Sequence, residues 1–197
     1  MTAQIGDSFR FEGTEYSMVA ISEPLKFNPR EYGITPESIC TCCWDGFWCV
    51  YNITADGIFL EDLYINSKDD FYPEINGVLP LSAGAGPDRF KYMDHHLYKG
   101  VNIKIPYTGK ILVGDEFIRD YYIHMGYQRA WAYNVLVELV FENGILIKTN
   151  DQSKIAAELR EKISKDENFE EKLYCNPLAF VLNSFTLDYG IKAWWLN

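Results

Sequence analysis

Seven residues between positions 115 and 131 combine carboxylate, imidazole and aromatic side chains that could do chemistry together. They are Asp115, Glu116, Asp120, Tyr121, Tyr122, His124 and Trp131. Acidic residues beside tyrosines suit a surface that attracts a basic protein by charge and anchors it through aromatic contacts. Alternatively, the carboxylates and His124 could supply a general acid and base beside a sugar-stacking platform. Packing of the same aromatic side chains in the core is the competing structural interpretation.

Four of the five cysteines lie close together, at Cys40, Cys42, Cys43 and Cys49. Structural zinc sites usually take their ligands from CxxC pairs in two separate knuckles, which this spacing does not provide. In an extended chain Cys40 and Cys42 face one way, and the other two face the opposite way. We therefore expect small, buried and reduced side chains here, with a reactive thiol as the alternative.

The other patterns that could hold a metal or cofactor are incomplete. His95 and His96 are adjacent, so on a strand they would face opposite sides, and a solvated loop pair is the simpler interpretation. The Gly84-Ala85-Gly86 run lacks the third glycine of a dinucleotide fingerprint and is followed by Pro87. No serine lies in a nucleophile elbow. The sequence therefore predicts no metal and no cofactor, and we assign no catalytic residue.

The charge of the chain restricts its partners. The formal net charge is −10 and the pI is about 4.8, so a nucleic-acid backbone would be repelled. A basic protein or a neutral small ligand stays compatible with this field. Residues 1–7 lack the basic and apolar parts of a signal peptide, and no apolar run approaches the roughly 20 residues of a membrane span. We therefore predict a cytoplasmic protein without a membrane segment.

Hairpins are the elements that must position these residues. A turn at Glu12-Gly13 would place Arg10 opposite Glu15 and Phe9 opposite Tyr16, which pairs opposite charges and then two aromatic rings.

Two further hairpins carry strong turn signals. A turn at Asp56-Gly57 predicts Ile53 opposite Leu60, with Val50 opposite Leu63 and Trp48 opposite Ile65 following from that register. A turn at Asn143-Gly144 predicts Phe141 opposite Leu146 and Val140 opposite Ile147.

The C-terminal part of the chain changes to helical patterning. Ile155, Ala156, Leu159 and Ile163 follow an amphipathic spacing, with Asp151 or Ser153 as N-cap. Asn176-Pro177 fits the N-cap and first position of a second helix. The apolar residues Trp194 and Trp195 are expected to dock on the body or to contact a second copy of the chain.

Together these patterns predict an α+β fold with a predominantly antiparallel sheet. The sheet should be twisted or partly closed, built from hairpins and covered by C-terminal helices. We expect one domain over residues 1–197, β-rich over 1–150 and helical over 151–197. The predicted function is a non-enzymatic binding or interaction protein, such as an acidic inhibitor or immunity-type partner of a basic protein. The alternative is a small-ligand or carbohydrate binder, or a hydrolase, that uses residues 115–131.

Overall fold

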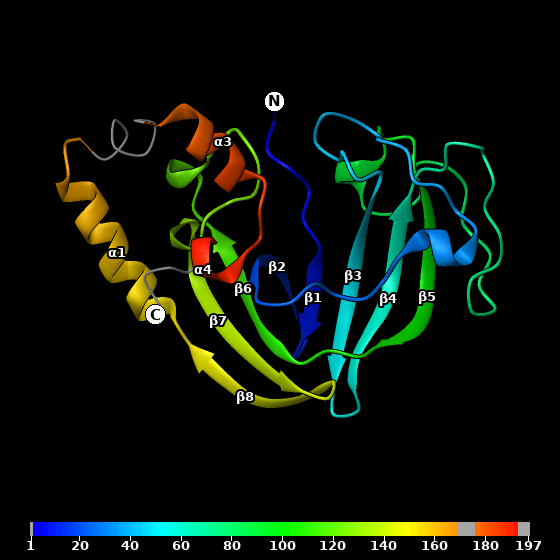
Figure 1. Ribbon diagram of the computed structural model, residues 1–197, viewed down its shortest axis with the longest axis horizontal. Coiled ribbons are helices and arrows are strands. Elements are labelled where there is room, and N and C mark those ends of the chain that lie inside the picture. Colours follow the sequence, from blue (N-terminus) through cyan, green and yellow to red (C-terminus); the bar gives the residue numbers. More distant parts are fainter. Residues whose placement is uncertain (1, 169–175, 193–197) are drawn as a thin grey trace.

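The computed structural model describes residues 2–168 and 176–192 and has an α+β fold (Figure 1). Its eight described strands form one sheet in the order β5-β4-β3-β1-β2-β6-β7-β8. The strands are β1 (Ser8–Phe11), β2 (Thr14–Ile21), β3 (Phe47–Thr54), β4 (Gly57–Ile65), β5 (His96–Ile105), β6 (Gly109–Phe117), β7 (Tyr133–Glu142) and β8 (Ile145–Asp151). Neighbouring strands are antiparallel except β1 and β3, which run parallel. The predicted fold class is confirmed.

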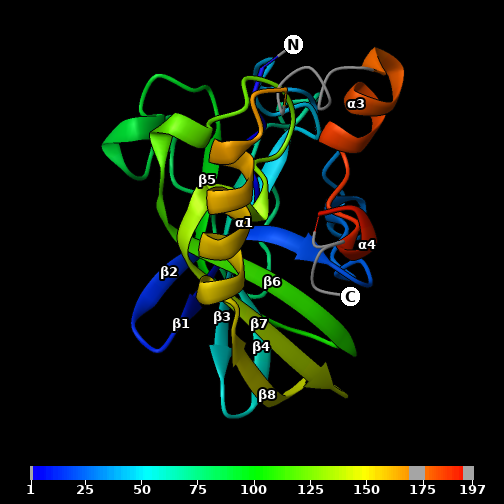
Figure 2. The same cartoon turned by 90° about the vertical axis from the view of Figure 1, so that its left-hand side faces the viewer.

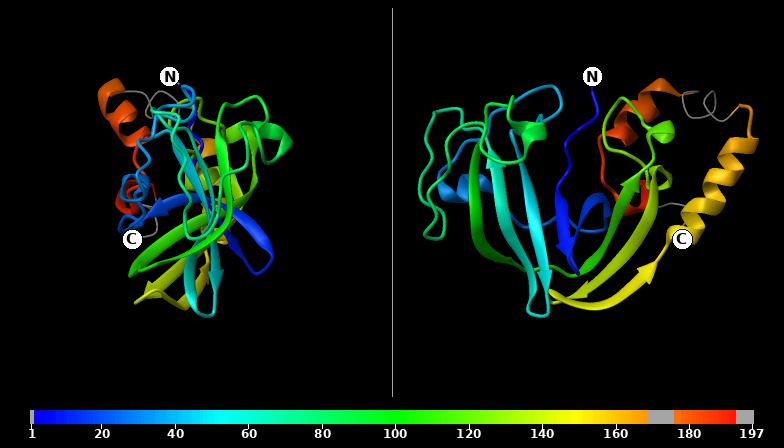
Figure 3. Two further views of the ribbon diagram at one scale, coloured as in Figure 1. Left: turned by 90° about the vertical axis from the view of Figure 1, so that its right-hand side faces the viewer. Right: turned by 180° about the vertical axis from the view of Figure 1, so that it is seen from behind.

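The sheet bends strongly into two arms that meet at β1 and β2. Figures 1 and 3 show β5, β4 and β3 in one arm and β6, β7 and β8 in the other. At the far end, the tips of the β3–β4 and β7–β8 hairpins come together. A Cβ atom on Gly57 would lie 2.9 Å from the Gly144 carbonyl oxygen, and Gly57 has a φ of +132°. Only glycine fits this close approach without strain.

The main apolar core joins the two arms. It contains Phe9 of β1 and Tyr51 of β3, whose rings stack with centroids 5.2 Å apart. Leu60 of β4 belongs to the same buried cluster, as do Ile111 of β6 and Phe141 of β7. Because one cluster takes side chains from both arms, its burial stabilises the curvature of the sheet.

The register of the first hairpin is the predicted one. Arg10 lies opposite Glu15 and Phe9 lies opposite Tyr16. The predicted register of the second hairpin is wrong, because its two-residue turn is Ala55-Asp56.

Gly57 consequently belongs to β4, where it pairs with Thr54 of β3. The Thr54 hydroxyl also accepts a hydrogen bond from the Asp56 N–H at 3.2 Å, which supports the earlier turn. Ile53 therefore pairs with Ile58.

Further along the same two strands, the other predicted pairs also fail. A β-bulge between Val50 and Tyr51 shifts the register again, so Val50 lies opposite Asp62 and Trp48 lies opposite Tyr64. A bulge adds one residue to one strand, which a turn signal in the sequence cannot reveal.

The third hairpin is predicted correctly at its turn and wrongly beyond it. Phe141 pairs with Leu146, as the Asn143-Gly144 turn requires. A bulge after this pair places Val140 opposite Lys148, one residue beyond the predicted partner.

The helices follow β8 in the chain. They are α1 (Ser153–Lys165), α3 (Pro177–Ser184) and α4 (Tyr189–Lys192), and short 3₁₀ turns cover Pro29–Tyr32, Asp88–Phe90, Arg119–Tyr121 and Ala130–Ala132. α1 packs against β7, and α4 contacts β2 and β6 (Figure 2). None of the described helices has the length and apolar character that a bilayer crossing requires.

The helix caps were predicted with mixed success. Asn176 caps α3 by accepting a hydrogen bond from the Ala179 N–H at 3.1 Å, as predicted. The cap predicted for α1 is wrong, because Gln152 occupies the N-cap position. Asp151 instead accepts the Ser153 N–H at 2.9 Å from one residue earlier. Trp194 and Trp195 lie outside the described residues.

Candidate functional site

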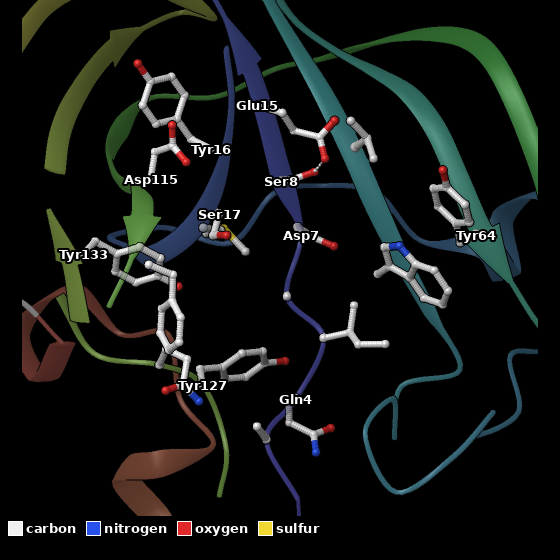
Figure 4. A pocket seen from close by; sticks show the side chains of 18 of the residues that line it. Gln4, Asp7, Ser8, Glu15, Tyr16, Ser17, Tyr64, Asp115, Tyr127 and Tyr133 are labelled. Carbon is white, nitrogen blue, oxygen red and sulfur yellow. Dashed lines mark hydrogen bonds between the residues drawn. The ribbon is translucent and has the colours of Figure 1, made fainter. Parts of the chain in front are cut away.

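A cavity of about 490 Å³ lies where the N-terminal segment enters the sheet, and we call it the Asp7 pocket. The segment 3–7 runs through it, between β3 and the loop that precedes β7 (Figure 4). The described lining residues are Ala3, Gln4, Ile5, Gly6, Asp7, Ser8, Arg10, Glu15, Tyr16, Ser17, Met18, Trp48, Val50, Tyr64, Pro87, Phe90, Asp115, Phe117, Tyr122, Tyr127, Gln128 and Tyr133. A cavity of this volume is in the range of small-molecule sites.

Backbone hydrogen bonds hold the N-terminal segment on both sides. The Gln4 N–H donates to the Gly126 carbonyl at 2.9 Å, and the Ile5 N–H donates to the Cys42 carbonyl at 2.8 Å. The Asp7 carbonyl accepts the Met18 N–H at 2.9 Å. These bonds place the Asp7 side chain at the centre of the cavity view (Figure 4).

Asp7 is a carboxylic acid in an unusual setting. Its Oδ1 accepts the Cys49 N–H at 2.7 Å. Burial raises the pKa of Asp7 to about 7, the Cys49 bond acts to lower it, and the charge of Asp45 acts to raise it. Near neutral pH the carboxyl group is therefore divided between its protonated and ionised forms, as a general acid or base, or a charge-sensing ligand group, would be.

The titratable groups that interact electrostatically with Asp7 are all acids. Its own pKa responds to Asp45, and its charge in turn raises the pKa values of Cys49, Tyr51 and Tyr127. The pKa of Cys43 is raised to about 12, first by burial and also by Asp45 and Asp7. In the part of the chain that the structure describes, no Lys, Arg or His side chain is ion-paired with Asp7.

Arg10 is the one basic side chain among the described lining residues, and acidic residues already surround it. Its guanidinium lies 3.1 Å from Glu15, 2.9 Å from Glu61 and 3.2 Å from Asp62. One positive charge thus faces three carboxylates. Asp115 adds a further carboxylate, so acidic side chains outnumber basic ones among the described lining residues.

Aromatic side chains lie on two sides of Asp7. Figure 4 shows Tyr64 on one side and Tyr127 and Tyr133 on the other. Trp48 and Tyr64 stack with ring centroids 4.7 Å apart. Trp48, Tyr64 and Tyr133 are themselves buried, so the rings that are most open to solvent in the lining are those of Phe117 and Tyr122. The π-electrons of such rings attract cations.

A buried histidine packs against the aromatic side chains on the Trp48 and Tyr64 side of the cavity, which we call the first aromatic wall. His95 is fully buried, and its ring lies 5.0 Å from that of Trp48. Its Nε2 is 2.9 Å from the Ala85 carbonyl oxygen, and burial lowers its pKa. The expected solvated histidine pair is therefore wrong, because His95 packs inside the protein while His96 begins β5 and contacts Tyr72.

The opposite side of the cavity, formed by Phe117, Tyr122, Tyr127 and Tyr133 and called the second aromatic wall, is more exposed to solvent. Phe117 contacts Tyr133 edge-on with centroids 5.5 Å apart, and it contacts Tyr122 at 6.4 Å. Tyr122 is 53% exposed and Phe117 is 39% exposed. Burial raises the pKa of Tyr133 to about 12, so its phenol stays protonated and can donate a hydrogen bond at neutral pH.

The structure separates the seven residues that the sequence singled out. Asp115 and Tyr122 line the Asp7 pocket. Trp131 is buried in an apolar cluster with Ile123, Ile163 and Phe180.

The other four predicted residues lie away from the cavity lining. Glu116, Asp120 and His124 are exposed, and Tyr121 is half-buried against the apolar clusters near α1.

The residue that the sequence interpretation missed is Asp7. It lies in an N-terminal segment that shows no motif, and its partners come from β2 and β3. The only local signal is a carboxylate directly before the first strand. Nothing in that signal distinguishes Asp7 from the other 27 acidic residues of the chain.

The expectation of reduced cysteines is wrong at one pair. Cys40 and Cys42 form a disulfide, whereas Cys43 and Cys49 are free and buried. Because Cys40 and Cys42 project to the same side of the chain, a turn between the Cys40 carbonyl and the Cys43 N–H brings them together. The Thr41 carbonyl between them accepts the Gln4 side chain at 2.9 Å, so this loop adjoins the wall of the Asp7 pocket.

No family model matches the chain, and no curated protein or solved structure matches it either. Within residues 2–168 and 176–192, no group of three or more His, Cys, Asp or Glu side chains is arranged to hold a metal ion.

Proposed function

We propose that this protein binds a small organic ligand in the Asp7 pocket. The observation that carries the proposal is a cavity of about 490 Å³ with aromatic rings on both sides of a partly buried carboxyl group (Figure 4). Ligand sites typically combine an apolar, aromatic lining with a few converging polar groups. The small-ligand or carbohydrate alternative drawn from the sequence is thereby moved from residues 115–131 to a site centred on Asp7.

Binding is proposed rather than catalysis because of the chemistry of the lining. The described lining residues include serines and carboxyl groups but neither histidine nor cysteine. A Ser–His or Cys–His pair is therefore not assembled within them. A cytoplasmic location is part of the same proposal.

The experiment fills the cavity and measures binding by calorimetry. Ser17 lines the pocket on β2, and Ser17→Phe would occupy its volume. Thr149→Phe on exposed β8 is the matched control. The probes are methyl β-glucoside, 3,3-dimethyl-1-butanol, choline and butylammonium.

We expect at least one of these probes to bind the wild type and the Thr149→Phe variant equally. Ser17→Phe should weaken that binding by about tenfold or more, since a ring would exclude the ligand. The proposal fails when none of the four probes binds, or when the filled cavity binds as well as the open one.

A second candidate function is an interaction with a basic protein. The specific observation is that Glu116 and Asp120 are exposed and lie close in the chain to the exposed rings of Phe117 and Tyr122. Charge steering combined with aromatic anchors favours protein recognition. An acidic inhibitor or immunity-type protein would use such a surface.

A ten-residue lysine peptide tests this candidate. Its affinity should fall by about tenfold between 20 and 200 mM salt, because screening weakens contacts between exposed charges. The double variant Glu116→Gln/Asp120→Asn should weaken binding, whereas Glu142→Gln on β7 should not. Salt-independent binding would contradict the candidate.

A further inference from the structure

We infer that the ligand of the Asp7 pocket is an organic ammonium ion, held with its charge near the Asp7 carboxylate and its carbon groups against the aromatic walls. This inference rests on the proposed function and narrows it to one class of ligand. It follows from three features of the described lining: Asp7 has no cationic partner there, acidic side chains outnumber basic ones, and aromatic rings are present.

The missing counter-ion is the first feature. Asp7 is partly buried, and a carboxylate withdrawn from water normally has a cationic partner or several hydrogen-bond donors. Asp7 receives the Cys49 N–H, while its electrostatic neighbours Asp45, Cys43, Cys49, Tyr51 and Tyr127 are all acids. A positively charged group entering the cavity would supply the attraction that the described residues do not.

The charged side chains of the described lining disfavour an anionic ligand. Arg10 cannot serve an anion without leaving Glu15, Glu61 and Asp62, to which it is ion-paired. Asp115 would repel the same anion. A phosphate or carboxylate ligand would therefore lose more than it gains here.

The aromatic rings favour an organic cation over a hydrated metal ion. Trp48, Tyr64 and Phe90 line one side of the cavity, and Phe117, Tyr122, Tyr127 and Tyr133 line the other. The exposed rings among them, Phe117 and Tyr122, can bind an alkylated ammonium group through cation–π attraction and through burial of its methyl or methylene groups. A hydrated inorganic ion would gain neither contribution, and it would need more oxygen ligands than this lining gathers.

Binding of a cation to Asp7 would be linked to its proton. The pKa of Asp7 is raised to about 7, so below neutral pH the cation must displace a proton. The affinity should therefore fall by about tenfold between pH 8 and pH 6.

The test compares choline with its neutral isostere 3,3-dimethyl-1-butanol at constant ionic strength. Choline should bind the wild type at least about tenfold more tightly than the isostere, and only choline should show the pH dependence. Asp7→Asn should remove most of this preference, and Asp69→Asn is the control at an exposed site. Tyr122→Ala, at the open wall, should weaken choline binding by about threefold.

The outcomes separate the inference from the proposed function. Equal binding of choline and the isostere, or binding of methyl β-glucoside alone, overturns the inference and leaves the pocket as a ligand site. Competition by sodium or magnesium chloride as effective as that by choline also overturns it, in favour of an inorganic cation. When none of the probes binds, the proposed function itself fails. Circular dichroism of Asp7→Asn verifies that this variant is folded.

Discussion

Two carboxyl groups of the curved sheet, Asp7 and Glu138, are both largely enclosed by protein and have opposite electrostatic settings. Burial raises the pKa of Asp7 to about 7, and the Cys49 N–H compensates only in part. Burial acts on Glu138 in the same direction, but hydrogen bonds from Tyr189 and Asn150 and the charge of Lys110 outweigh it, so the pKa of Glu138 is lowered.

The difference separates a structural carboxylate from a candidate binding group. Glu138 lies on β7 and connects β8, β6 and α4 through its partners, so its charge stabilises the fold. Asp7 faces a cavity without a cationic partner among the described residues, so its charge costs stability. Groups that destabilise the ligand-free protein in this way are typical of binding sites.

The largest expected effect is the loss of the Glu138 network. Glu138→Ala should lower the free energy of unfolding by about 2 to 4 kcal/mol, because it leaves buried partners without their acceptor. Urea denaturation measures this change. Glu142→Ala, exposed at the end of the same strand, is the control and should change stability by less than about 0.5 kcal/mol. If Glu138→Ala lost no more stability than Glu142→Ala, Glu138 would not be a stabilising carboxylate.

Asp7→Asn should stabilise the protein, whereas Glu138→Ala should destabilise it. At pH 8 it should raise the free energy of unfolding by about 1 to 3 kcal/mol, because the amide keeps the Cys49 hydrogen bond without the cost of a buried charge. Between pH 3.8 and about 7 native Asp7 holds a proton that the unfolded chain has lost, so wild-type stability falls as the pH rises through this window.

The gain from Asp7→Asn should therefore vanish below about pH 4, where both states of the wild type are protonated. Thermal unfolding of both proteins from pH 4 to pH 8 measures the difference. A pH-independent gain would show that the carboxyl charge is not its cause. Asp120→Asn, at an exposed position, is the control.

Tyr189→Phe should have a smaller effect on the Glu138 side. Removing this hydroxyl should cost about 1 kcal/mol at pH 7. Since the pKa of Glu138 is lowered in the folded state, the stability it contributes is present above the unfolded value of 4.5 and is lost as the pH falls through the folded value. Chemical denaturation at pH 7 and pH 3 should show the difference between wild type and variant shrinking at the lower pH. A constant difference would assign the effect to packing.

The smallest effect is expected at the Cys40–Cys42 disulfide. It closes a loop with a sequence separation of two residues, so it removes little entropy from the unfolded chain. Reduction should change the free energy of unfolding by less than about 1 kcal/mol, as measured by urea titration with and without reductant. The position of the N-terminal segment 3–7 would then depend on its backbone hydrogen bonds and not on the disulfide. A large loss of stability or of choline binding on reduction would make the disulfide part of the pocket.

Local sequence signals located two of the three predicted hairpin turns, whereas the Asp56-Gly57 signal was wrong because that turn lies one residue earlier, at Ala55-Asp56. The Glu12-Gly13 and Asn143-Gly144 turns specified the first pairs of their hairpins, and Asn176 specified the start of α3. The signals failed beyond β-bulges, as at Val50, because a bulge depends on how neighbouring strands pack.

The candidate site was predictable only in part. Asp115 and Tyr122 were singled out because acidic and aromatic residues are concentrated around them, and both line the pocket. Trp131 was singled out for the same reason but is buried. Spacing along the chain cannot tell a ring at a cavity wall from a ring in the core, because both positions require the same residue types.

The sequence by itself determined the acidic charge, the turns at Glu12-Gly13 and Asn143-Gly144, and the α+β class. These depend on composition and on contacts between residues close in the chain. Only the tertiary structure decided that Asp7 would become the centre of a pocket. Its backbone lies against β2, its carboxyl against β3 and its cavity against aromatic rings from both arms of the sheet. The raised pKa of Asp7 follows from this enclosure, and segments distant in the sequence create it together.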